Sequence, residues 1–124
     1  MNKTLNKISR YLLTRNINLI EGENKNYYKF TFESNDIHIY NTEDKIRFTC
    51  FYKVNIKNEK ELLTVLKLIN EINRKTEFVK LTLINKDIIS AETSEKEEII
   101  TNHYKTIIND FLEDISLIES LYIK

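Results

Sequence analysis

The chain has 124 residues, of which 41% are hydrophobic and 31% charged, a composition typical of one globular domain and not of a disordered chain. Its 19 lysines and arginines balance its 19 aspartates and glutamates, so the net charge gives no reason to expect nucleic acid or an anionic membrane as a partner. A single cysteine excludes an internal disulfide, and the sequence shows neither an apolar run long enough to span a bilayer nor the apolar block of a signal peptide, so we expect a cytoplasmic protein.

The N-terminal segment is predicted to form an amphipathic helix over residues 4–15. Leu5, Ile8 and Leu12 lie at positions i, i+3 and i+7, which places them in one apolar stripe. A short extended link and a polar loop around Gly22 should follow, and they lead into the first strand.

Three consecutive strands are predicted at residues 27–33, 36–40 and 45–54. The third gives the clearest strand signal, because apolar and polar residues alternate strictly over its ten positions. The residues expected on its inner face are Ile46, Phe48, Cys50, Tyr52 and Val54.

The turns between these strands predict a three-stranded meander. A two-residue turn at Ser34-Asn35 would pair Phe32 with Ile37, and a four-residue turn at residues 41–44 would pair Ile37 with Phe48. Both pairings place the same apolar side chains on one face of the sheet. A slip of one residue at either turn would break this agreement.

The second half of the chain is predicted to contain a helix, a hairpin and a long helix. The first helix covers Glu59–Lys75 and has Asn58 as its N-cap. Two strands follow at residues 78–84 and 88–93. The capping-box pattern of Ser94-Glu95-Lys96-Glu97 predicts a helix from Glu95 to about Leu121.

The element order is therefore α-β-β-β-α-β-β-α over a single domain, residues 1–124. Hairpin connections predict an α+β fold with a single, mainly antiparallel five-stranded sheet packed against helices. The hairpins fix neighbours within each group of strands, but they leave open how the two groups join.

Residues 62–94 carry a resemblance to a known family. The helix ends in the phrase Leu68-Ile69-Asn70-Glu71-Ile72-Asn73, a strand led by Phe78 follows, and the next strand ends near Glu92 before Ser94-Glu95. This pattern resembles the type III secretion chaperone-like fold, in particular the YbjN-type domains described as bacterial sensory-transduction regulators. The resemblance spans nearly the whole chain and implies a binding role and a homodimer, but it implies no activity.

The residues that could carry chemistry do not form a consistent site. Cys50 and His38 are the residue types of a nucleophile and its base, but the strand alternation points Cys50 inward and His38 outward, opposite Arg47. His103 and Glu113 lack the i, i+4 spacing of a helical metal pair. We therefore expect a protein that is not an enzyme and has no cofactor and no metal site.

The outer face of the predicted sheet is the candidate binding surface. Tyr27, Tyr40 and Phe51 should lie on it, and clustered exposed aromatics are common in interfaces, although cross-strand aromatics can also serve only to stabilise a sheet. We predict a non-catalytic protein-binding module that contacts another protein or a second copy of itself. The alternative is a regulatory domain that binds a small ligand in a pocket between sheet and helices.

Overall fold

A computed structural model describes residues 2–24 and 26–122 and confirms the α+β fold. One antiparallel sheet has the strand order β1-β2-β3-β4-β6-β5. The sheet has six strands and not the predicted five, because Ile20 and Glu21 pair with Lys29 and Tyr28 as a short edge strand. The elements are α1 (Lys3–Thr14), β1 (Ile20–Glu21), β2 (Tyr27–Phe32), β3 (Asn35–Thr42), β4 (Lys45–Lys53), α2 (Glu59–Lys75), β5 (Lys80–Leu83), β6 (Ile88–Lys96) and α3 (Glu97–Tyr122).

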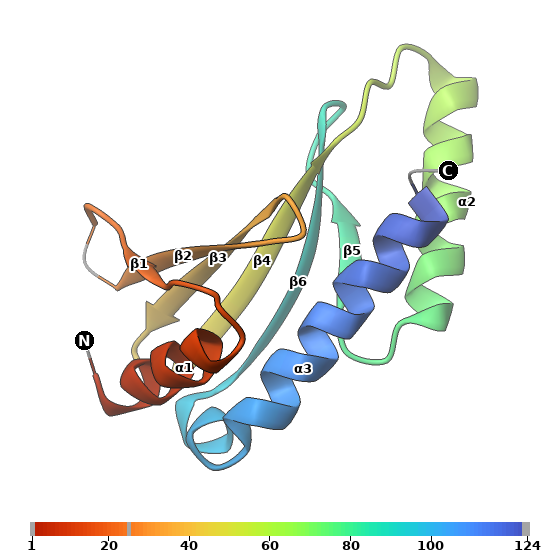
Figure 1. The fold of residues 1–124 in the computed structure, drawn as a ribbon. Helices are drawn as coiled ribbons and strands as arrows, with labels where there is room; N and C mark the ends of the chain where they lie inside the picture. Colours follow the sequence, from red (N-terminus) through yellow and green to blue (C-terminus); the bar gives the residue numbers. More distant parts are fainter. Residues whose placement is uncertain (1, 25, 123–124) are drawn as a thin grey trace.

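The helices leave one face of the sheet uncovered. Figure 1 shows α1 and α3 on the same side of the sheet and α2 beside its β5 edge. The core fills the space between the sheet and the helices α1 and α3, where the rings of Phe48 and Phe111 lie 5.6 Å apart. Within the described residues, the helices do not include one that is both long and apolar enough to cross a membrane.

Both predicted turn registers are wrong by two residues. The β2–β3 turn is formed by Glu33 and Ser34, both with positive φ, so Phe30 and not Phe32 lies opposite Ile37. The β3–β4 turn also has two residues, because Thr42 pairs with Lys45. Two-residue turns with left-handed backbone match the twist of a hairpin, and they lengthen both strand ladders. The shift is even, so every side chain keeps its predicted face.

The predicted start of the last helix is also wrong. Ser94 and Lys96 belong to β6, where they pair with Arg47 and Lys45 of β4, and α3 begins at Glu97. Pairing with the long strand β4 therefore overrides the local capping-box pattern, and these residues extend β6 instead of starting the helix. The helix also departs from helical geometry at His103, where it is kinked.

Helix α2 has the predicted bounds, and its N-cap is confirmed. The Asn58 side chain accepts a hydrogen bond of 2.9 Å from the backbone N–H of Glu61. Only Ile69 and Ile72 are buried in this helix, whereas Leu63 is 58% exposed. The apolar stripe is therefore fully buried only in the C-terminal half of the helix, while Val65 packs partly buried against the core.

The side chain of Asn73 anchors α2 to the edge strand β5. Its Nδ2 donates to the carbonyl of Leu81 at 3.1 Å, and its Oδ1 accepts from the N–H of the same residue at 2.7 Å. Asn73 thus takes the place of a neighbouring strand at one residue of this edge, and unpaired sheet edges are where strands of other molecules can add.

We expect Asn73→Ala to lower the free energy of unfolding by about 1–3 kcal/mol, because both backbone groups of Leu81 lose a half-buried partner. Urea denaturation followed by circular dichroism measures this loss. The matched control is Asn70→Ala, an exposed asparagine on the same helix, which should change stability by less than about 0.5 kcal/mol. Equal losses in the two variants would contradict the anchoring role.

Candidate functional site

Four rings form a continuous cluster on the uncovered face of strands β2, β3 and β4. We call Tyr27, His38, Tyr40 and Phe51 the outer aromatic cluster. Tyr27 lies opposite Tyr40 in the register, with ring centroids 5.3 Å apart, and the His38 ring lies 5.4 Å from that of Phe51. His38 also stacks on Tyr27 at 5.8 Å. The three predicted site residues therefore lie on one face, with His38 joining Phe51 to the tyrosines.

Arg47 holds one side of this cluster. Its guanidinium lies 4.6 Å from the ring centroid of Tyr40, and its Nε is 3.8 Å from a carboxylate oxygen of Glu92. The Thr49 hydroxyl donates a hydrogen bond of 3.4 Å to the same carboxylate. The predicted four-residue turn placed Arg47 opposite His38, but the observed register places Arg47 opposite Tyr40 and His38 opposite Thr49.

His38 is the residue of this site whose part the sequence analysis missed. It was expected on the outer face but not as part of the site. Its position two residues before Tyr40, which puts both side chains on the same face of the strand, could have indicated its role. Its Nδ1 lies 2.5 Å from the hydroxyl oxygen of Tyr27. Burial lowers the pKa of His38, nearby Asp36 raises it, and Lys29 lowers it. Burial also raises the pKa of Tyr27, and Tyr40 and Asp36 raise it further.

The lowered pKa of His38 makes a testable prediction. As pH falls below the ordinary histidine value of about 6.5, the unfolded chain binds the proton before the folded chain does, so the free energy of unfolding should fall. Between about pH 7.5 and about pH 5.5, the free energy of unfolding should fall less in His38→Gln than in the unaltered protein, as measured by urea denaturation. An NMR titration midpoint of His38 at or above 6.5 would contradict this account.

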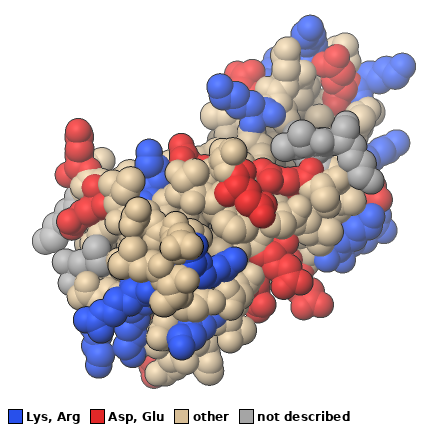
Figure 2. Space-filling model, in the orientation of Figure 1, with Lys and Arg blue, Asp and Glu red and all other residues tan. Residues whose placement is uncertain are grey.

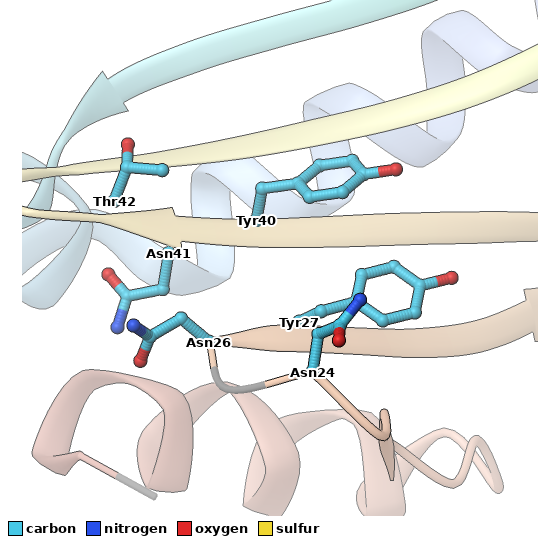
Figure 3. A pocket seen from close by; sticks show the side chains of 6 residues that line it. All are labelled: Asn24, Asn26, Tyr27, Tyr40, Asn41 and Thr42. Carbon is cyan, nitrogen blue, oxygen red and sulfur yellow. The ribbon is translucent and has the colours of Figure 1, made fainter.

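A pocket of about 400 Å³ opens at the end of strands β2 and β3 beside the cluster (Figure 3). Of the residues that the structure describes, those that line it are uncharged, namely Asn24, Asn26, Tyr27, Tyr40, Asn41 and Thr42. The Oδ1 atom of Asn41 is buried without a hydrogen-bond partner among the described residues. Figure 3 shows the rings of Tyr27 and Tyr40 side by side on neighbouring strands. The pocket lies at the ends of these strands, whereas the ligand pocket considered from the sequence would lie between the sheet and the helices.

Cys50 lies on the buried face, as predicted, and the sheet separates it from His38. Burial raises the pKa of its thiol to about 11, with the hydrogen bond from Tyr52 lowering it and the charge of Glu119 raising it. A thiol is nucleophilic only as the thiolate, so this cysteine is unreactive in the folded protein. His103 is exposed, and no group of three or more His, Cys, Asp or Glu side chains in the described part of the chain is arranged to hold a metal ion.

We therefore expect the native protein to resist thiol reagents. At pH 8, labelling with a disulfide reagent should be slow in buffer and rapid in urea, because unfolding exposes Cys50 and restores its ordinary pKa. Ser94→Cys, which introduces a thiol at an exposed position, is the control for reagent access and should label at once. Immediate reaction of the unaltered folded protein would show that Cys50 is accessible.

The comparisons with known proteins support the fold. No family model matches the chain, and no curated protein matches it. Among solved structures, the chain is similar to the crystal structure of YbjN from E. coli, a candidate transcription regulator. The similarity covers 94% of this chain and 91% of that chain, with 14% sequence identity and a TM-score of 0.60. The chain thus has a YbjN-type fold, and the likeness extends to the fold alone.

Proposed function

We propose that this protein is a non-catalytic, protein-binding module whose outer aromatic cluster contacts an extended segment of another protein or of a second copy. The observation that supports this proposal is the cluster itself. Phe51 is 46% exposed, and the other three rings are only partly buried, on a sheet face that the helices leave open. Contiguous exposed apolar surface with a polar rim often marks an interaction site, and aromatic residues are enriched in interfaces.

The geometry of the cluster suits binding by contact. Each ring touches at least one other ring, and Arg47 fixes the position of Tyr40. Side chains that are held in place before binding lose less conformational entropy when a partner arrives. A partner segment laid across β2, β3 and β4 would therefore meet a largely preformed surface.

The test begins with affinity capture of the tagged protein from cells that naturally make it, followed by mass spectrometry. Replacing Tyr40 and Phe51 together with Ser should weaken association with the captured partner by about tenfold or more, because aromatic residues often dominate binding energy. Calorimetry measures the affinity, and circular dichroism should show an unchanged fold. Leu13→Ser is the matched control, since Leu13 is 54% exposed on α1.

An unchanged affinity in the folded double variant would overturn this surface assignment.

The pocket beside the cluster supports the small-ligand alternative. Its lining shares Tyr27 and Tyr40 with the proposed protein-binding surface. A thermal-shift screen against metabolites separates the two functions, since a ligand that binds only the native state raises the melting temperature.

A further inference from the structure

The charges of the chain are not evenly distributed between the two faces of the sheet. Strand register places six cations but only two carboxylates at outer-face positions. Because the whole chain carries nineteen of each, the other positions hold thirteen cations and seventeen acids. The cations are Lys29, Lys45, Arg47, Lys53, Lys80 and Lys96, and the acids are Asp36 and Glu92.

The opposite, helix-covered side has a different character. Figure 2 shows acidic and basic side chains together on that side, with acids grouped over the middle of the molecule. The zero net charge of the chain therefore conceals an excess of positive charge on the outer face.

This excess is only partly neutralised within the domain. Of the six cations, Arg47 alone forms an ion pair within 4 Å among the described residues. Lys80 donates to the carbonyls of Asn73 and Thr76 at the end of α2. Lys45 lies directly opposite Lys96, an arrangement of like charges that is destabilising, although Lys96 also shares a pocket with nearby acids. Lys29 and Lys53 are therefore the clearest positions for a test.

We infer that the partner of this face is an acidic polypeptide segment, with a short apolar stretch flanked by Asp and Glu residues. This inference rests on the proposed function and names the chemistry of its partner. The apolar stretch would cover the outer aromatic cluster, and the flanking carboxylates would meet the surrounding lysines. Opposite charges across an interface favour encounter and suppress wrong partners.

The ring faces of the outer aromatic cluster are partly occupied by neighbouring side chains, which favours a polypeptide partner over a single-stranded nucleic acid. Bases bind such surfaces by stacking on open ring faces. Here the guanidinium of Arg47 covers one face of Tyr40, and Tyr27 and His38 stack on each other with an angle of 14° between their rings.

The experiment measures binding of a fluorescein-labelled peptide with an apolar centre and acidic flanks, by fluorescence anisotropy. Lys29→Glu with Lys53→Glu should weaken binding by about tenfold or more, and added salt should weaken binding to the unaltered protein. The matched control, Lys67→Glu with Lys105→Glu, makes the same change in net charge at exposed helical positions and should stay within about twofold. Circular dichroism verifies the fold of each variant.

Three results would overturn the inference: equal binding of a peptide with lysine flanks, equal weakening by the control variant, or tighter binding of an oligothymidylate of the same charge. The proposed function is judged separately, from the natural partner and the Tyr40→Ser, Phe51→Ser variant. If that variant loses the natural partner while charge reversal at Lys29 and Lys53 leaves it bound, only the acidic chemistry is wrong. If neither change affects the natural partner, both proposals are wrong.

Discussion

The alternation of side chains along β4 is the constraint on which the rest of the structure depends. β4 pairs with β3 on one side and with β6 on the other, so its register fixes the face of every residue in three strands. Burying one large apolar side chain such as Phe48 contributes about 1.5–3 kcal/mol. A slip of one residue would expose Phe48 and Cys50 and bury Arg47 and Lys53, and burying unpaired charges is costly.

The same constraint creates the outer aromatic cluster. Once the inner face is committed to the core, Tyr40 and Phe51 must point outward, where contacts with His38 and Arg47 hold them in place. Aromatic pairs contribute about 0.5–1.5 kcal/mol each beyond the area that they bury. The rings are thus stabilised within the domain itself, although Phe51 remains 46% exposed.

The faces of the sheet could be predicted from sequence because they depend on parity, whereas the turns depend on single residues. Glu33 and Ser34 adopt left-handed backbone in a turn expected at Ser34-Asn35, and no proline or glycine marks the position. The start of α3 was mispredicted because Ser94 pairs with Arg47 across the sheet, a long-range interaction that a local capping pattern does not contain. The charge of the outer face was missed for a similar reason, since a whole-chain balance says nothing of which face each lysine occupies.

The most direct test of the central claim is amine cross-linking of the captured complex, read by mass spectrometry. The outer face carries Lys29, Lys45, Lys53 and Lys96, and the helices carry Lys7, Lys67 and Lys105 as internal references. If the outer face binds the partner, cross-links to the partner should concentrate on the first set. Cross-links confined to the helical lysines would show that the partner binds elsewhere and would contradict the account.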